Sequence, residues 1–442
     1  MHVQDNIMRR LRNPRRFLRA ASRYAAAYPS ALYATMLPSI RLSRLLGMSP
    51  RGPEIDLAQV NRMLVVRLDD IGDMVLTTPL LRELRRNLPE AKITLLVKPL
   101  VHNLVELCPY VDEVLIFDET ESGIGGPLRR HWRAWHLAHA ELWPRRFDLA
   151  ILPRWDADRY HGSFVTYLSA ARWRVGYSVK IDKRKRQFNR GFDNLFTHVV
   201  LDVTPKHEVE RGLDLIRFLG GTVREESLEL WLSAEDELRA NQLLASHGVD
   251  ARDLLIAFGP GTDDPKRQWP IANFVALGDW LKREYRARLV VIGGNQDKPL
   301  GQVLQTSLGN QLINATGQLT LRQTTALLAR CDLFLGNDSG PMHLAAAVGV
   351  PVVEISAHPV AGPPLHPRSP VRFGPWGVPC RVLQPSKAIA PCSDACTATR
   401  PHCILSVTVD PVKAASSLLL SQRTAQPTPP QTFEGHPKPE ST

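Results

Sequence analysis

The sequence predicts an α/β protein made of two Rossmann-like domains that face each other across a cleft. Short apolar runs without polar alternation, typical of buried parallel strands, alternate with amphipathic helical segments along most of the 442 residues. This alternation occurs in two blocks of similar size, which indicates two doubly wound sheets with right-handed crossovers. Because ligands of such sheets bind beyond the carboxyl ends of the strands, we expect functional residues in the loops that follow them.

The first block, assigned to residues 61–233, begins with a buried strand at 63–68 and a loop at 69–73. Leucines that recur on one stripe of 74–88 then predict an amphipathic helix. The tryptophan-rich segment 121–146 is expected to form a helical insertion. Further strands are expected at 92–97, 113–117 and 147–152, a helix at 206–219 and a crossing segment at 222–233.

The second block, assigned to residues 234–422, repeats the pattern. An apolar strand at 332–335 runs into a short loop and an alanine-rich helix. The Pro-rich tail, 423–442, has few apolar residues and is expected to be disordered. Other strands are expected at 254–258, 288–292 and 351–355, and helices at 270–285 and 321–329.

Positive charge is concentrated in an N-terminal extension, residues 1–60. Ten arginines and one acidic residue fall within 1–52, so the rest of the chain contributes only +2 to the net charge of +11. Arginines interspersed with apolar and aromatic residues favour a peripheral anchor on an anionic membrane, with a solvated tail as the alternative. A nucleic-acid binder is disfavoured, because its basic residues would spread over the folded body. No transmembrane helix or signal peptide is predicted. The cysteines do not require an oxidising compartment, so a cytosolic setting is the simpler expectation.

The six cysteines fall into two groups. Cys108 and Cys331 lie in apolar surroundings and are expected in the core. Four more lie within 24 residues of one another, namely Cys380, Cys392, Cys396 and Cys403. Clustered thiols can bind zinc, form disulfides or remain reduced, but their spacing here is irregular and lacks a repeated Cys-x-x-Cys. The role of the cluster stays open, and no metal site is predicted from it.

The loop that opens the alanine-rich helix carries the clearest motif. Backbone N–H groups at a helix start are unpaired and attract phosphate. Ser339 can add a hydroxyl donor, Gly340 lets the backbone approach a ligand, and His343 can face the same anion or be a structural histidine. We expect a diphosphate seat here, with Pro341 in the same turn and Asp338 orienting the loop or a ligand hydroxyl.

Three acidic residues lie in the loop after the first strand. Asp73 follows a strand's carboxyl end, where a carboxylate facing the cleft can act as a general base; a helix N-cap is the alternative. Gly72 permits a tight turn and leaves room for a ligand. Asp70 is expected to shape the loop or contact substrate on the acceptor side. A metal site built from these three acids is not favoured, because the sequence shows no matching acidic partner elsewhere.

The third loop combines a Gly-rich turn with two cations. Gly261 and Thr262 follow a predicted strand and are assigned to binding the substrate that carries the diphosphate. Lys266 or Arg267 can neutralise the charge that builds on a departing diphosphate, and the alternative is a surface pair without a role in the reaction. The loop is therefore expected to complete the diphosphate site.

Together, the three motifs resemble glycosyltransferase family 9, and in particular its heptosyltransferases. The resemblance covers about residues 62–420. It rests on the segments 66–81, 260–270 and 336–347, with support from Gly-Pro-Trp-Gly at 374–377 and from the later cysteines.

The resemblance implies a GT-B fold with no cofactor and no nucleotide-bound metal. It implies inverting transfer of a sugar, often a heptose from ADP-heptose, to the inner core of lipopolysaccharide. The enzyme would then work in the cytoplasm, peripherally on the inner face of the inner membrane. Asp73 matches the family's catalytic base, and Ser339, Gly340, Pro341 and His343 match its pyrophosphate-binding turn.

The sequence departs from the family pattern at two places. The family's cation usually stands two residues before the tryptophan, here Trp269. Arg267 holds that place and Lys266 lies one residue further away, so either can be the catalytic cation. The basic extension is not part of the usual enzyme and leaves the acceptor open.

Two other classes of function fit the sequence less well. A nicotinamide dehydrogenase would carry G-x-G-x-x-G after the first strand, and the loop found there lacks it. A non-catalytic nucleotide-sugar-binding protein of the same fold would keep the pyrophosphate turn but could dispense with Asp73. Because Asp73 is present, the sequence favours an enzyme.

Overall fold

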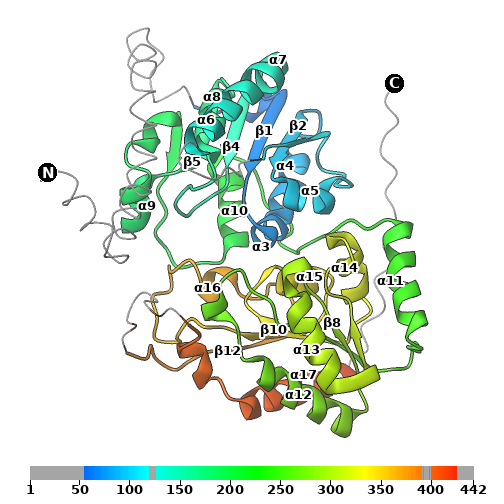
Figure 1. The fold of residues 1–442 in the computed structure, drawn as a ribbon. Helices are drawn as coiled ribbons and strands as arrows, with labels where there is room; N and C mark the ends of the chain where they lie inside the picture. The colour runs from blue at the N-terminus through cyan, green and yellow to red at the C-terminus, as the bar shows by residue number, and fades with distance from the viewer. Residues whose placement is uncertain (1–53, 119–125, 391, 393–397, 399, 426–442) are drawn as a thin grey trace, which may run out of the picture.

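The computed structural model describes residues 54–118, 126–390, 392, 398 and 400–425 (Figure 1). The arginine-rich segment interpreted as an anchor lies outside the described residues, as does most of the predicted Pro-rich tail. Within the part of the chain that is described, no helix has the length and apolar character needed to cross a bilayer.

Two six-stranded parallel sheets form the centres of two domains, drawn one above the other in Figure 1. The first sheet has the order β3-β2-β1-β4-β5-β6, and the second has the order β12-β11-β10-β7-β8-β9. The first comprises β1 (Arg62–Arg67), β2 (Lys92–Val97), β3 (Glu113–Ile116), β4 (Leu149–Leu152), β5 (Trp173–Tyr177) and β6 (His198–Val200). The second comprises β7 (Leu255–Gly259), β8 (Arg288–Val291), β9 (Leu312–Asn314), β10 (Leu333–Asn337), β11 (Val352–Ile355) and β12 (Cys380–Leu383).

The two strand orders are the same order read from opposite edges. In each sheet the first and fourth strands are neighbours, β1 beside β4 and β7 beside β10, and the chain winds away from them in both directions. Connections that leave such a switch point in opposite directions open a crevice beyond the strand ends. The loops after β1, β7 and β10 are the three loops that carry the sequence motifs.

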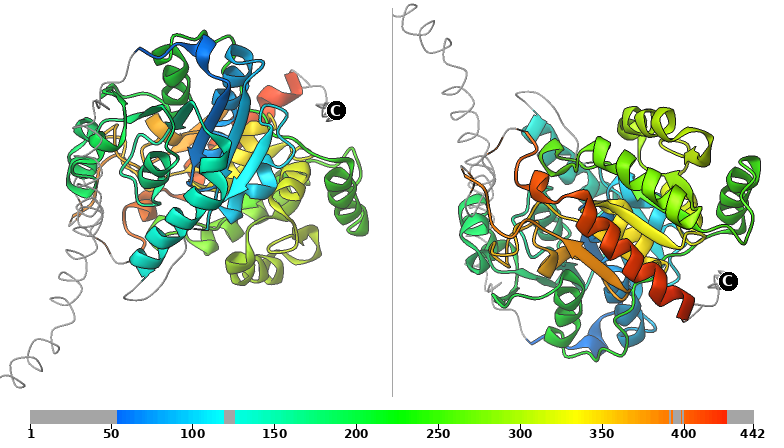
Figure 2. Two further views of the ribbon diagram at one scale, coloured as in Figure 1. Left: turned by 90° about the horizontal axis from the view of Figure 1, so that it is seen from above. Right: turned by 90° about the horizontal axis from the view of Figure 1, so that it is seen from below.

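Helices connect the strands in both domains. Those of the first domain are α3 (Ile71–Val75), α4 (Thr78–Asn87), α5 (Pro99–Val105), α6 (Gly126–Leu137), α7 (Trp143–Arg145), α8 (Gly162–Leu168), α9 (Lys183–Phe188) and α10 (Glu208–Phe218). Those of the second are α11 (Ala234–Ser246), α12 (Ile271–Tyr285), α13 (Lys298–Leu308), α14 (Leu321–Leu328), α15 (Gly340–Ala347), α16 (Pro370–Phe373) and α17 (Val409–Ala425). Figure 2 shows α17 lying across the second sheet, and it extends three residues into the range predicted as a disordered tail.

The strands predicted from apolar runs are all present, and buried apolar residues pack in several clusters against both sheets. The four central residues of β1, from Met63 to Val66, are fully buried. Cys108 and Cys331 are buried in the core, as predicted. Four further strands, β5, β6, β9 and β12, were not predicted from the sequence. In β5 the apolar run is interrupted by Arg174 and Gly176, so its pattern does not stand out.

The helix predicted over 74–88 is wrong in one respect, because the structure divides it. α3 ends at Val75, and α4 begins at Thr78. Pro79 has no N–H to donate to the carbonyl of Val75, and the Thr78 hydroxyl bonds to that carbonyl instead, at 2.8 Å. The break leaves α3 as a short helix that carries Asp73.

A buried ion-pair cluster joins the two domains. Arg372 of α16 is fully buried, and its guanidinium lies 2.7 Å from Glu208 Oε1 and 3.0 Å from Asp156 Oδ2, both in the first domain. Its guanidinium carbon also lies 4.6 Å from the centre of the Trp155 ring. Since removing one partner of such a cluster leaves the others charged and buried, the cluster holds the domains in a defined orientation.

We predict that Arg372→Ala lowers the free energy of unfolding by about 3–5 kcal/mol, because Glu208 and Asp156 would lose a buried cation. The matched control is Arg217→Ala, since Arg217 pairs with Asp214 at 2.8 Å while 48% of its side chain is exposed. The control should cost less than about 1 kcal/mol. Urea unfolding of both variants measures the difference, and equal losses would contradict the role assigned to Arg372.

Candidate active site

A cavity of about 1410 Å³ lies between the domains, and every residue predicted for the site lines it. The first domain contributes the loop after β1, including Asp70, Gly72 and Asp73. The second domain contributes its two switch-point loops, with Gly261, Thr262, Lys266 and Arg267 after β7 and Asp338, Ser339, Gly340, Pro341 and His343 after β10. The sequence motifs, which are far apart in the chain, therefore share one cavity.

The two domains touch closely where α3 meets α15. A Cβ atom on Gly72 would lie 2.4 Å from Cδ2 of His343, and one on Gly340 would lie 2.9 Å from Cβ of Ile71. Both distances are below van der Waals contact, so a side chain at either glycine would require the facing side chain or the helices to shift. These two glycines allow the start of α15 to lie against the helix that carries Asp73.

Asp73 lies in the first turn of α3, and 23% of its side chain is exposed. Its Oδ1 accepts a hydrogen bond from Arg67 Nη2 at 3.2 Å. Burial raises the pKa of Asp73 from 3.8 to about 6, against the lowering effect of the Arg67 cation. The residue at the N-cap position of α3 is Asp70, so the alternative that Asp73 serves as an N-cap is wrong.

Arg67 lies in the first sequence motif, which gave it no role, and the structure shows that it holds this loop in place. It is buried at the end of β1 and lies 3.0 Å from Asp69 Oδ2, and it donates to the carbonyl of Pro153 at 3.1 Å. Asp69 is itself buried and also pairs with Arg154. Asp69 is therefore held between two arginines and shapes the loop, while Asp73 keeps an open side.

Asp70 stands at the rim of the first-domain wall. Its side chain is 54% exposed and accepts bonds from Lys98 Nζ at 2.9 Å and from the Tyr160 hydroxyl at 3.0 Å. The Lys98 ammonium also lies 3.7 Å from the centre of the Tyr160 ring. Lys98 and Tyr160 come from other loops of the same domain, and no local motif marked them in the sequence.

The start of α15 has the features of an anion seat. Ser339 occupies the N-cap position with extended backbone, and no described side chain caps the first turn. The Ser339 hydroxyl donates to the Asn337 carbonyl at 3.2 Å, and Pro341 has no N–H. The amides of Ser339 and Gly340 are then the backbone donors nearest the helix start, where the dipole favours negative charge.

The sequence analysis allowed His343 to face the same anion as the start of α15, but the structure shows that its ring is not a cation. Burial lowers its pKa to about 3, so its ring is neutral at physiological pH and adds no positive charge to the seat. The ring packs on Gly72, and among the described residues Nδ1 has no hydrogen-bond partner. His343 can contribute a neutral hydrogen bond and a surface for α3, but not an electrostatic attraction.

The two cations after β7 have different surroundings. Arg267 is mostly buried, lies 2.9 Å from Asp338 Oδ2 and also pairs with Asp263. The Lys266 side chain is 30% exposed, and its Nζ lies 3.6 Å from Asp264 Oδ2. Asp264 in turn pairs with Arg368 at 2.8 Å. Arg267 is thus held by two carboxylates, while Lys266 has one distant and shared partner.

Asn337 ties the two second-domain loops together. Its amide group donates to the carbonyl of Pro260 at 2.7 Å, and its oxygen accepts from the backbone N–H of Trp269 at 3.0 Å. The Thr262 hydroxyl is also used within its own loop, where it donates to the carbonyl of Asp264 at 2.7 Å. A Cβ on Gly261 would lie 2.3 Å from Asp297, so that position excludes a side chain.

Comparison with known proteins identifies a family. The model of glycosyltransferase family 9 (heptosyltransferase) matches residues 141–387. The lipopolysaccharide core heptosyltransferase OpsX of Haemophilus influenzae is 23% identical over 314 residues, which cover 71% of this chain and 81% of that protein.

Solved structures share the fold. A family 9 glycosyltransferase from Veillonella parvula has a TM-score of 0.68 at 24% identity, covering 84% of this chain and 99% of that one. The ADP-heptose lipopolysaccharide heptosyltransferase II of Escherichia coli has a TM-score of 0.61 at 22% identity, covering 82% of this chain and 99% of that one. The two Rossmann-like domains with a cavity between them are the GT-B arrangement expected from the sequence.

Proposed function

The chain belongs to glycosyltransferase family 9, and from this premise we propose that it transfers a heptose from ADP-heptose to the core of a lipopolysaccharide-type acceptor, with inversion of configuration. The names of its relatives support both substrates, since they include a lipopolysaccharide core heptosyltransferase and an enzyme named for ADP-heptose. Because the chain is a glycosyltransferase, the alternative of a non-catalytic nucleotide-sugar-binding protein does not apply.

The observation that carries the proposal is the contact between α3 and α15. It places a carboxylate, Asp73, beside the helix start that suits a diphosphate, with each group on a different domain. A donor seated at Ser339 and Gly340 would direct its sugar toward the first domain. An acceptor on that side could then attack the sugar from the face opposite the diphosphate, which gives inversion.

Asp73 is the proposed general base. A base works best when its pKa lies near the working pH, and the pKa of about 6 leaves Asp73 deprotonated at neutral pH but more basic than an ordinary aspartate. Arg67 holds one carboxylate oxygen, which orients the other for the acceptor hydroxyl. We propose that Asp70, with Lys98 and Tyr160, contacts the acceptor at the rim.

Lys266 is the proposed catalytic cation. Arg267 already pairs with Asp338 and Asp263, so recruiting it to a diphosphate would leave the largely buried Asp338 carboxylate without its partner. Lys266 can leave Asp264 at little cost, because Arg368 still pairs with that carboxylate. In this proposal Lys266 and the amides at the start of α15, rather than a metal ion, stabilise the departing diphosphate.

We also propose that the enzyme works on the cytoplasmic face of the inner membrane, where a glycolipid acceptor would be presented. The helix α6 supports this, since Leu128, Trp132 and Trp135 are 65%, 73% and 43% exposed on a segment that also carries Arg129 and Arg133. Exposed tryptophans beside arginines are typical of helices that lie in a membrane interface. The arginine-rich segment 1–52 would add attraction to anionic lipid.

For Asp73→Asn we predict a loss of turnover of about 10²–10⁴ with little change in donor affinity, because only proton removal is affected. In the unmodified enzyme kcat/KM should fall as the pH drops below about 6, since a base with a raised pKa becomes protonated there. Initial rates with ADP-heptose and heptose-deficient core acceptor, together with calorimetry of donor binding, test this. Equal losses of turnover and donor affinity would mean that Asp73 only shapes the site.

For the two cations we predict opposite patterns. Lys266→Ala should lower kcat by about 10²–10³ while the melting temperature stays unchanged, because a donor to the leaving group is removed. Arg267→Ala should instead lower the melting temperature, since Asp338 loses its buried partner. Measuring kcat and thermal unfolding for both variants decides the assignment, and a fully folded Arg267→Ala enzyme with the larger loss of kcat would reverse it.

For membrane binding we predict that the full chain sediments with vesicles containing phosphatidylglycerol but not with pure phosphatidylcholine vesicles. Trp132→Ala combined with Trp135→Ala should weaken this binding, and so should deletion of 1–52. Leu238→Ala is the control, because Leu238 is 56% exposed on α11 of the other domain. Binding that survives both changes together would contradict the membrane proposal without affecting the transfer reaction.

A further inference from the structure

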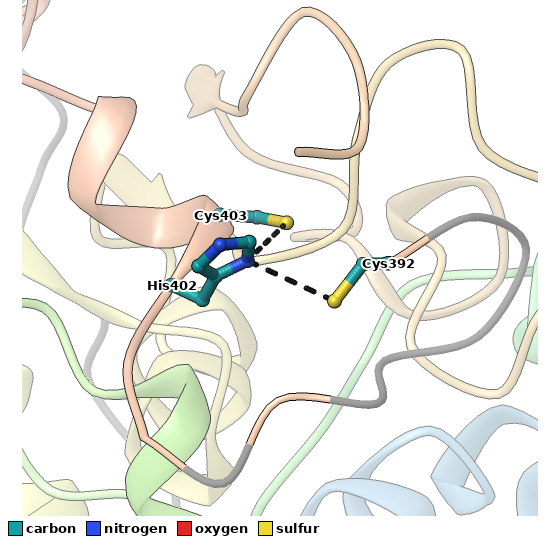
Figure 3. Close-up of side chains that lie close together, drawn as sticks. All are labelled: Cys392, His402 and Cys403. Carbon is teal, nitrogen blue, oxygen red and sulfur yellow. Dashed lines mark hydrogen bonds between the residues drawn. The ribbon is translucent and has the colours of Figure 1, made fainter. Parts of the chain in front are cut away.

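We propose that Cys392, His402 and Cys403 form a binding site for a zinc ion that fixes one wall of the cavity. Figure 3 shows the two thiols and the imidazole converging on a common point between two segments of the chain. Cys392 and Cys403 belong to the predicted cysteine cluster, whose role the sequence left open, whereas His402 was not predicted. Cys396 of that cluster lies outside the described residues. The inference concerns a structural ion, separate from the proposed catalytic groups.

The spacing of the ligand atoms fits tetrahedral zinc. His402 Nδ1 lies 3.8 Å from Cys392 Sγ and 3.6 Å from Cys403 Sγ, and all three ligand atoms lie within 4.8 Å of one another. Zinc bonds of about 2.3 Å to sulfur and about 2.0–2.1 Å to nitrogen, at tetrahedral angles, give a nitrogen–sulfur separation of about 3.6 Å. A Cys₂His set is a known zinc ligand set, which leaves a fourth position for water or another ligand.

The scaffold around the triad holds two of the ligands in place. His402 and Cys403 lie at the start of a short 3₁₀ helix, Cys403–Ser406, whose Ile404 is fully buried in the second-domain core. The next residue after this helix, Val407, accepts a bond from the Trp269 indole at 2.6 Å. Two adjacent ligands on an anchored turn lower the entropy lost when an ion binds.

A backbone amide also supports the proposed thiolate. The N–H of Ile389 donates to Cys403 Sγ at 3.4 Å. Amide donors to ligand sulfurs are a typical outer shell of metal-bound thiolates. The carbonyl of the same Ile389 accepts from the N–H of Cys392 at 2.9 Å, so one residue orients both cysteines.

The ion would connect this site to the donor side of the cavity. The segment before Cys392 runs beside the loop after β11: Gln384 donates to the carbonyl of His358 at 2.7 Å, and Val360 donates to the carbonyl of Pro385 at 2.8 Å. That loop continues to Arg368, which pairs with Asp264 beside Lys266. An ion joining Cys392 to the anchored turn would therefore close this segment into a fixed wall, and all three ligands line the same cavity.

A disulfide between Cys392 and Cys403 is the competing arrangement. A disulfide would use both sulfurs but would not explain why His402 Nδ1 lies close to each of them. Zinc uses all three groups, and the softness of the thiolates favours zinc over magnesium or calcium. The two arrangements can be distinguished under reducing conditions. Bound zinc would still protect the two thiols from alkylation, whereas a disulfide would be reduced and would leave them reactive.

The test uses the full chain, purified with a reductant, stripped with a chelator, desalted and then supplied with Zn²⁺. We expect about one tightly bound zinc per chain by plasma mass spectrometry, and a thiolate-to-cobalt charge-transfer band when Co²⁺ replaces zinc. Cys392→Ser, His402→Ala and Cys403→Ser should each lose most of the bound metal. Cys380→Ser is the matched control, because Cys380 is a half-buried cysteine of the same domain outside the triad.

A second measurement on the unmodified chain covers the case in which a variant fails to fold. Zn²⁺ should protect Cys392 and Cys403 from alkylation, mapped by peptide mass spectrometry, while Cys380 reacts equally with and without the ion. No retained zinc and no protection would overturn the proposal, as would equal metal loss in Cys380→Ser. Iron in place of zinc in the untreated protein would overturn the choice of metal.

Discussion

The contact between α3 and α15 is the constraint on which the rest of the site depends. Gly72 gives room to the His343 ring, and Gly340 gives room to Ile71, so one glycine from each domain allows the two helices to meet. The carboxylate on one helix and the open start of the other are brought together only by that approach. The buried Arg372 cluster acts at a second point of the same boundary, and both contacts help to fix how the domains face each other.

The charges in the cavity are divided between groups that hold the structure and groups that are open to a ligand. On the first-domain wall, Arg67 is occupied by Asp69, and Asp73 keeps one exposed side and a raised pKa. On the second-domain wall, Arg267 is occupied by Asp338, and Lys266 remains the more available cation. On the first-domain wall the buried Arg67 also bonds to Asp73 and fixes its position, which favours a preorganised site.

Much of the second-domain wall of the cavity is assembled from contacts that are distant in sequence. Asn337 joins the loop after β10 to the loop after β7, and Arg368 reaches Asp264 from beyond β11. The proposed zinc site adds a third connection of this kind, through Cys392. Hydrogen bonds and ion pairs of this kind can hold loops that line an open cavity, because exposed loops have too little apolar packing to hold them in place.

The sequence by itself determined most of the strands, the loops that follow them and the residue types those loops present, because apolar periodicity and loop chemistry are local properties of the chain. The loop motifs predicted one site containing Asp73, Ser339 and either Lys266 or Arg267, and the structure shows that all four residues line one cavity. Tertiary structure decided that His343 is neutral, that Arg267 is occupied and that Cys392 meets His402. Each of these depends on burial or on a partner from elsewhere in the chain. Arg267 and Asp338, for example, are 71 positions apart, and a local sequence pattern cannot predict a contact between residues so far apart.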